Sequence, residues 1–242
     1  MNGPFAAFKW KALFNQFDIF LNGFLITLEV AILGLILALI LGIIFGMLST
    51  SRFKILKAIS RIYVEVIQNT PLVIQVFFLF NGLPYIKIVL PVFAIGVIGV
   101  GVYHGAYISE VVRAGITSIP KGQFEAAKAQ GFSHNQAMRY IILPQTIKII
   151  IPPLTNQLVN LIKNTSVLAM IAGGDLMYRA DSWSTSNMYY GPAYVVTGIL
   201  YFILCYPLAR LSRKLELRKK KTKEVEGATL NTRMTSTIEG GV

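Results

Sequence analysis

Charged residues are scarce in this chain, and acidic ones are the scarcest. Of its 242 residues only 14% are charged, against 54% that are hydrophobic, and 11 acidic residues stand against 23 Lys and Arg. Soluble domains carry about 25% charged residues. The shortage of charge therefore argues against an ordinary soluble domain and indicates a membrane protein with several spans.

Residues that bind metals or build catalytic sites are also few. The one cysteine, Cys205, lies in an apolar run, which excludes a disulfide framework and a thiolate metal cluster. The two histidines, His104 and His134, are far apart in the sequence and have no companions at metal-binding spacing. No Gly-x-x-x-x-Gly-Lys-Ser/Thr phosphate loop is present. We therefore predict that the chain is not an enzyme and binds no metal, and that any ATPase it uses is a separate chain.

The basic residues give a formal net charge of +12. A strongly basic balance is also typical of nucleic-acid-binding proteins. Here, however, the basic residues form short clusters beside apolar runs and along the C-terminal tail. Such clusters are typical of the cytoplasmic side of membrane proteins. We therefore expect membrane lipid, and no nucleic acid, as a partner.

Five apolar runs are each long enough to cross a bilayer, which takes about 20 helical residues. They predict an all-α membrane protein with five transmembrane helices, at residues 20–48, 62–80, 88–112, 149–172 and 193–211. A turn is expected at Asn81–Pro84, and residues 173–190 are expected to form an outer loop. Residues 1–18 interleave aromatic and basic side chains, which predicts an amphipathic segment at the membrane interface.

Basic residues also predict the orientation. Arg52, Lys54, Lys57 and Arg61 follow the first apolar run, and further basic residues follow the third and the fifth. Lys and Arg gather in cytoplasmic loops, so the N-terminus is expected outside and the C-terminus in the cytoplasm. Residues 212–242 are expected to form a cytoplasmic tail that is first basic and then disordered.

Small residues recur at every fourth position in the first and third runs. The two series are Gly34, Ala38, Gly42 and Gly46, and Gly101, Gly105 and Ser109. On a helix this spacing forms a flat face that lets another backbone approach closely. Both runs are therefore expected to pack tightly against other helices.

A polar insert at residues 120–145 separates the third and fourth runs. It predicts a short helix at 123–129 that ends at Gly131, and a second at 135–142 that Ser133 caps and that ends near Pro144. The pattern is defined by Gly122, Glu125, Ala126, Ala127, Gly131, Ile141, Leu143 and Pro144. Composition alone leaves two interpretations, a docking element or an ordinary surface feature.

The insert resembles the EAA loop of bacterial ABC importer permeases, whose helix sits in a cleft of the ATPase subunit. The resemblance covers about residues 20–211 and includes Asn-Thr-Pro-Leu at 69–72 and Lys-Asn-Thr-Ser at 163–166. These motifs look like those of polar amino-acid uptake permeases, most of all the glutamine/glutamate branch. One departure is Gln68, where many relatives carry Arg.

The resemblance implies a type I ABC importer permease fold, with the permease domain at residues 19–211, and a function in ATP-driven uptake of polar amino acids. It implies residence in the bacterial cytoplasmic membrane. The implied partners are two ATP-binding cassette ATPase subunits, which bind ATP and Mg²⁺, a second permease copy, identical or related, and an extracytoplasmic amino-acid-binding protein. The permease itself is expected to bind no cofactor.

Polar residues at mid-depth of the second and fourth runs are candidates for the substrate path. At 1.5 Å per residue, positions about ten residues from the cytoplasmic end of a span lie near the bilayer midplane. Polar groups there are costly and usually face a pathway or another helix. The candidates are Asn69, Thr70, Gln75, Asn156, Asn160 and Lys163. Lys163 is suited to pairing with a substrate carboxylate, and the alternative for each residue is a hydrogen bond that only holds helices together.

Other functions stay open at this point. An importer of basic amino acids (Arg, Lys or His) or of cystine would share the same architecture. An ion-coupled secondary transporter would need a functional acidic residue inside the membrane and would be expected to contain an internal repeat, which we do not find. A structural membrane protein would have no transport activity at all.

Overall fold

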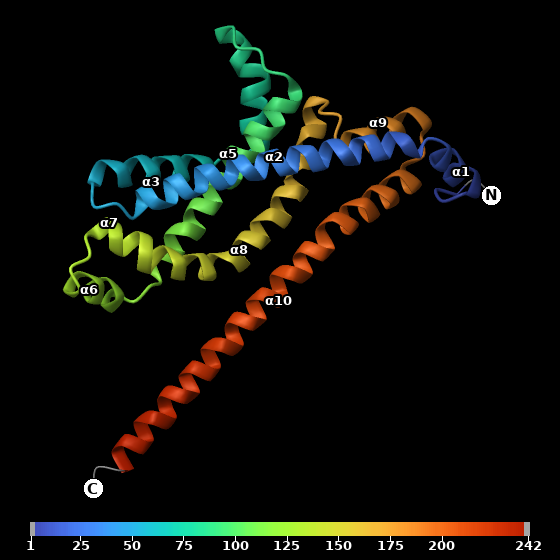
Figure 1. The fold of residues 1–242 in the computed structure, drawn as a ribbon. Helices are drawn as coiled ribbons and strands as arrows, with labels where there is room; N and C mark the ends of the chain where they lie inside the picture. Colours follow the sequence, from blue (N-terminus) through green and yellow to red (C-terminus); the bar gives the residue numbers. More distant parts are fainter. Residues whose placement is uncertain (1–2, 240–242) are drawn as a thin grey trace.

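The computed structural model describes residues 3–239, with side chains through residue 217, and every regular element in this part of the chain is a helix (Figure 1). The longest apolar element is α2 (Phe17–Ser49), and α5 (Val92–Thr117) makes the most extensive contact with it. These helices match the predicted first and third spans within a few residues. The predicted tail beyond residue 217 lies outside the residues whose side chains are described.

The small-residue faces do pack closely. Gly34, Ala38, Gly42 and Gly46 are all buried on α2. A Cβ placed on Gly46 would lie 2.6 Å from the Cβ of Val112 on α5, so only a hydrogen fits there. On α5, Gly101 lies similarly close to α2, because a Cβ added there would lie 2.7 Å from a methyl carbon of Leu37. The two faces therefore bring the α2 and α5 backbones together, as small residues do between membrane helices.

The predicted second span is broken. It consists of α3 (Lys54–Gln68) and, after Pro71, of α4 (Leu72–Phe77), the π-helical η1 (Phe78–Gly82) and the 3₁₀-helical η2 (Leu83–Ile86). The two halves meet at 99°. A continuous helix at 62–80 was therefore a wrong prediction, because proline lacks an N–H and its ring clashes with the preceding turn. The turn comes at Lys87, in the left-handed region (φ 62°), and not at Asn81–Pro84.

The polar insert forms two helices, α6 (Lys121–Ala129) and α7 (His134–Ala137). The second does not end near Pro144, as predicted. It runs through the π-helical η3 (Met138–Ile142) directly into α8 (Leu143–Asn164), and Pro144 lies in the first turn of α8. Because the helix is continuous here, the π-helical turn of η3 accommodates the missing N–H of Pro144.

The outer segments form a second core. It joins α1 (Ala7–Asn15), the start of α2, α9 (Leu176–Asn187) and α10 (Tyr190–Glu239), with Leu13, Phe20, Leu176 and Trp183 buried together. Residues 173–190 are therefore not a plain loop. Asp175 begins α9, because its side chain accepts a hydrogen bond from the N–H of Met177 (3.0 Å).

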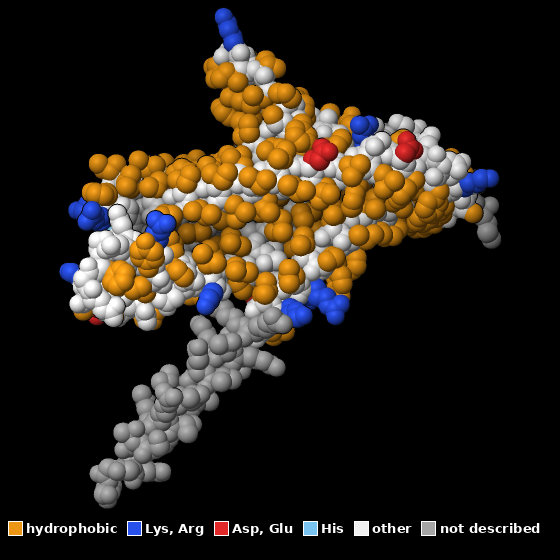
Figure 2. Space-filling model, in the orientation of Figure 1, with side chains coloured by type: hydrophobic (Ala, Val, Ile, Leu, Met, Phe, Trp, Pro, Cys, Tyr) orange, Lys and Arg blue, Asp and Glu red, His pale blue; other side chains and the backbone are white. Residues whose placement is uncertain are grey.

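By length and composition, three helices of the described chain can cross a membrane, α2, α5 and α10, or four if the bent pair α3–α4 is one span. The predicted fourth span corresponds to α8 and the 3₁₀-helical η4 (Thr165–Ile171), and it fails the same test. At 22 residues α8 is long enough, about 33 Å. The helix fails the test because of its composition, since one face carries amides and a lysine. Figure 2 shows apolar side chains over most of the visible surface.

Candidate translocation cavity and coupling segment

A polar cavity of about 240 Å³ lies between α5 and α8. It is lined by Tyr103, His104 and Tyr107 from α5 and by Gln157, Asn160, Lys163 and Asn164 from α8. These residues recur at intervals of three and four on each helix, so one face of α5 meets one face of α8. The lining contains hydroxyls, amides, an imidazole and one ammonium group, and no carboxylate.

His104 joins the two helices at the base of this cavity. Its side chain is 2% exposed, and its ring contacts two amides of α8. The amide nitrogen of Asn164 donates to Nε2 (3.0 Å), so Nδ1 carries the ring proton and donates to Oε1 of Gln157 (3.3 Å). The companions of His104 in the structure are therefore not metal-binding residues. Its partners are amides that lie more than fifty positions away, which sequence spacing does not reveal.

The rim of the cavity is more accessible. The hydroxyls of Tyr103 and Tyr107 lie 3.1 Å apart, and the side chains of Asn160 and Lys163 are exposed. An ammonium group beside amides and hydroxyls is suited to binding a carboxylate and a polar side chain. Neither a metal-binding cluster nor a nucleophile beside a base occurs among the described residues, so the chemistry this cavity offers is binding.

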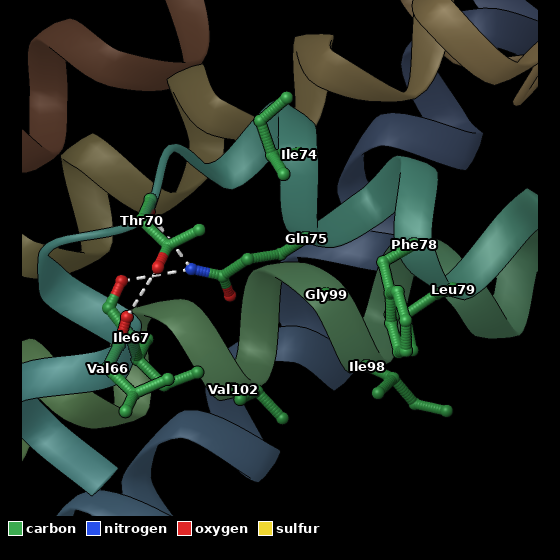
Figure 3. Close-up of a pocket in the computed structure, with 10 residues that line it drawn as sticks. All are labelled: Val66, Ile67, Thr70, Ile74, Gln75, Phe78, Leu79, Ile98, Gly99 and Val102. Atoms are coloured by element: carbon green, nitrogen blue, oxygen red, sulfur yellow. Dashed lines mark hydrogen bonds between the residues drawn. The ribbon is translucent and has the colours of Figure 1, made fainter. Parts of the chain in front are cut away.

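The predicted path residues are divided between three places. Asn160 and Lys163 lie in the polar cavity. Asn69, Thr70 and Gln75 lie at the break between α3 and α4, where their side chains donate to backbone carbonyls. The amide of Gln75 donates to the carbonyls of Ile67 (2.9 Å) and Thr70 (3.1 Å), as Figure 3 shows.

These bonds replace helix hydrogen bonds that the break removes. The amide of Asn69 donates to the carbonyl of Glu65 (2.8 Å), and the hydroxyl of Thr70 donates to that of Val66 (2.7 Å). An unpaired backbone carbonyl is costly inside a membrane. Thr70 and Gln75 also border a second cavity of about 460 Å³, which is otherwise lined by apolar residues of α3–η1 and α5.

Asn156 joins α8 to α10. Its amide nitrogen donates to Oε1 of Glu216 (2.8 Å), and its amide oxygen accepts from the hydroxyl of Ser212 (3.0 Å). The same hydroxyl also lies 3.2 Å from the carbonyl of Pro152, in the proline pair of α8. These contacts fasten α10 to α8 near Ser212 and Glu216, while the place of Asn156 on a substrate path stays a prediction.

The coupling segment, residues 120–145, presents α6 to solvent. Gly122, Glu125 and Ala126 are exposed, and Ala127 is buried. On the side opposite the solvent, Ile141 and Leu143 pack against the larger of the two hydrophobic cores. Pro144 is exposed in the first turn of α8. The exposed face of α6 is therefore accessible to another protein.

Two local motifs hold this segment. Gly131 has φ +83°, and the N–H of Phe132 donates to the carbonyl of Ala127, which is the Schellman ending of a helix. Ser133 then begins α7 with a capping box, in which Gln136 returns the hydrogen bond. Both the left-handed glycine and the serine cap were predicted from the sequence. The ring of Phe124 stacks on that of His134 at 5.8 Å and fixes α6 against α7.

Comparison with known proteins agrees with this architecture. Residues 34–221 match the family described as "Binding-protein-dependent transport system inner membrane component". The chain is 41% identical to the "Probable glutamine ABC transporter permease protein GlnM" of Bacillus subtilis over 87% of this chain and 97% of that protein. It is 33% identical to the "L-cystine transport system permease protein TcyB" of the same species, over 88% and 92% of the two chains.

Solved structures give the same result. One described as "Crystal structure of an amino acid ABC transporter with histidines" has a TM-score of 0.80 and 31% identity, and the match covers 86% of this chain and 98% of that one. A structure of the MetNI methionine ABC transporter shares the fold, with a TM-score of 0.66 at 16% identity, over 83% and 98% of the chains. The chain belongs to the family of inner membrane components of binding-protein-dependent transport systems, and it is the permease subunit of an ABC transporter and not its ATPase.

Proposed function

We propose that this permease imports polar amino acids, with glutamine or glutamate as the favoured substrate. The observation that supports this most is the cavity between α5 and α8. Its lysine is suited to a carboxylate, and its amides and hydroxyls are suited to an ammonium group and a side-chain amide. The relatives named as glutamine permeases, at 41% and 35% identity, favour the same substrate class.

The lining argues against a basic substrate. A cationic side chain is bound best by a carboxylate, and none of the seven lining residues is acidic. Cystine has two carboxylates and two ammonium groups and lacks a side-chain amide. The cystine permease among the relatives keeps cystine as the second candidate substrate.

The proposed topology has five spans, with α3–α4 as one bent span and α8 as the span whose polar face lines the path. Lys and Arg at the α2–α3 turn and on α10 favour a cytoplasmic C-terminus and an outer N-terminus. In this orientation α6 faces the cytoplasm. It is then placed to receive an ATPase subunit, which binds the ATP and Mg²⁺, and to transmit its movement to α8.

The polar face also requires a second permease chain. Asn160 and Lys163 are exposed on the surface of one copy, and contact of these groups with lipid chains would be costly. A second copy, identical or related, would close a water-filled path over them. Two ATPase subunits and an extracytoplasmic binding protein complete the proposed importer.

Reconstitution tests this proposal. The permease, co-purified with the ATPase encoded beside it, is expected to show ATP-dependent uptake of glutamine in vesicles, stimulated by the binding protein. Arginine and cystine serve as competing substrates. Uptake without the ATPase would identify a secondary transporter, and the absence of both uptake and stimulated ATP hydrolysis would leave only a structural role.

Two substitutions test the cavity itself. Asn160→Ala and Lys163→Met each remove a polar partner of the substrate, and Lys163→Met removes a charge-assisted bond worth about 1.5–3 kcal/mol. We expect Lys163→Met to lower the substrate affinity of the reconstituted complex by about tenfold or more. Lys148→Met, also exposed on α8 but outside the cavity, is the control. Unchanged uptake and affinity in both cavity variants would show that these residues do not line the path.

A further inference from the structure

A third cavity, of about 310 Å³, lies where the α2–α3 turn meets α7. Its walls are of two kinds. Apolar side chains come from α2, α5 and η3, among them Met47, Ile116 and Met138. Polar and cationic side chains come from the turn and from α7, among them Arg52, His134 and Asn135. This cavity is separate from the translocation cavity and shares no residue with it.

Arg52, the charged residue of this wall, has no ion-pair partner among the described residues. No acidic residue occurs between Glu29 and Glu65, a stretch that includes Arg52, Lys54 and Lys57. The ion pairs within the described residues join Arg61 to Glu65 and Arg113 to Glu110, and neither involves the cavity. The guanidinium group of Arg52 contacts the ring of Phe53 instead (5.3 Å). The cavity is therefore complementary to an anion.

The apolar wall continues along α2. Ile36, Ile40, Ile44 and Met47 are each between 41% and 51% exposed, at spacings that align them on one helix face. From Ile36 to Met47 this stripe extends about 16 Å, which is about the depth of one bilayer leaflet. In Figure 2 the apolar surface along α2 gives way to Lys and Arg side chains at the end where α2 meets α3. Met47 belongs to both the stripe and the cavity.

We propose that this cavity binds the headgroup of an anionic phospholipid, with an acyl chain along the α2 stripe. A cationic recess at one end of an apolar stripe of leaflet depth fits that shape, and basic pockets beside membrane helices bind such headgroups. Because α7 forms one wall and leads through η3 into α8, the bound lipid bridges the α2–α3 turn and the coupling segment. The site and its ligand are independent of which substrate the permease carries.

Lipid retention tests this site directly. The purified permease–ATPase complex is released from nanodiscs that contain phosphatidylglycerol and phosphatidylcholine in equal amounts, and bound lipids are counted by native mass spectrometry. The wild type is expected to retain phosphatidylglycerol preferentially. One basic residue near a membrane surface contributes about 1 kcal/mol, so Arg52→Gln is expected to weaken this retention about fivefold.

Three further variants keep the test specific. Arg52→Lys preserves the charge and is expected to retain the lipid. Asn135→Trp fills the cavity without changing the charge and is expected to lose it. Arg213→Gln removes an equal charge on α10, outside the cavity, and is expected to behave as the wild type. Equal loss in Arg213→Gln and Arg52→Gln would overturn the proposal, as would retention in Asn135→Trp.

Two other outcomes would also overturn it. Equal retention of phosphatidylcholine would show that the headgroup charge is not recognised. Displacement of phosphatidylglycerol by excess inorganic phosphate would identify a site for free phosphate. If Arg52→Gln instead dissociated the ATPase while lipid retention stayed unchanged, the cavity would be a contact for that subunit. Because retention is measured without transport, a failed uptake assay would leave this result unaffected.

Discussion

Single polar residues in this permease divide into those that hold helices together and those that stay available for a ligand. Thr70 and Gln75 donate hydrogen bonds to backbone carbonyls at the α3–α4 break, and Asn156 is hydrogen-bonded to α10. Asn160 and Lys163 make no such bonds within the described chain and lie on the rim of a polar cavity. At this scale, the available hydrogen-bonding groups are the reason for proposing that this cavity binds the substrate.

Asp175 is a residue whose ionisation depends on the fold. It lies between η4 and α9, outside the helices that can cross the membrane, and it is fully buried. One carboxylate oxygen caps α9, and the other has no hydrogen-bond partner among the described residues. Burial raises the pKa of Asp175 from 3.8 to about 6, although hydrogen bonds from backbone N–H groups oppose this shift.

This shift predicts a pH dependence of stability. The folded protein holds the Asp175 proton more tightly than the unfolded chain, so its free energy of unfolding falls as the pH rises from about 4 to about 6, by at most about 3 kcal/mol. Asp175→Asn keeps the helix cap and removes the titration, so it is expected to flatten this part of the profile. Thermal unfolding of the solubilised complex at several pH values measures it. Asp181→Asn, on the exposed surface of α9, should retain the wild-type profile, and a profile of Asp175→Asn that matches the wild type would contradict the prediction.

Helices in this chain are interrupted where function requires a change of direction. Pro71 separates α3 from α4 at 99°, and Gly131 separates α6 from α7 through a left-handed residue. The π-helical η3 joins α7 to α8 without a turn. We therefore propose that a displacement of the α6–α7 pair moves the helix that carries Asn160 and Lys163. These elements therefore form a direct connection between the proposed docking face and the cavity.

Gly131 is the position in this connection at which we expect a substitution to have the largest effect. No atom lies within 4 Å of a Cβ added there, so a side chain would not clash, but φ +83° strains any residue other than glycine. Gly131→Asp adds charge as well. We expect this variant to stay in the membrane and to lose ATP-coupled uptake, as measured in vesicles with the ATPase present.

Gly198→Ala, on α10 and outside the coupling segment, provides the control. An added Cβ at this position also meets nothing within 4 Å, and Gly198 does not have a positive φ. This variant is expected to keep its uptake. Full uptake by Gly131→Asp would mean that this turn does not couple ATP hydrolysis to transport.

At the scale of the whole molecule, a single copy leaves two unlike surfaces exposed. One side of the α5–α8 pair carries polar groups at the depth of the membrane, while α2 presents a broad apolar face. Water or protein must cover the first surface, and lipid is suited to the second. We therefore propose that a second permease chain covers the polar face and that lipid covers the apolar face of α2.

Thiol cross-linking tests this arrangement. On a Cys205→Ala background, Asn160→Cys is expected to cross-link to a second permease chain through a short bifunctional reagent in native membranes. Ile36→Cys, about half exposed on the apolar face of α2, is expected to remain uncross-linked. The reverse result would place the contact between copies on α2 and leave the polar face without a cover.

Local chemistry determined much of this protein before any fold was considered. The first, third and fifth apolar runs, the small-residue faces of α2 and α5, the left-handed Gly131 and the Ser133 cap all follow from interactions within a few residues, and the structure confirms them. The polar cavity does not follow in this way. His104, Gln157 and Asn164 form their hydrogen bonds only when α5 lies against α8, because each partner is a residue on another helix. The break at Pro71 and the continuity through Pro144 were likewise decided by tertiary structure, since a proline ends one helix and is accommodated in another according to what packs around it.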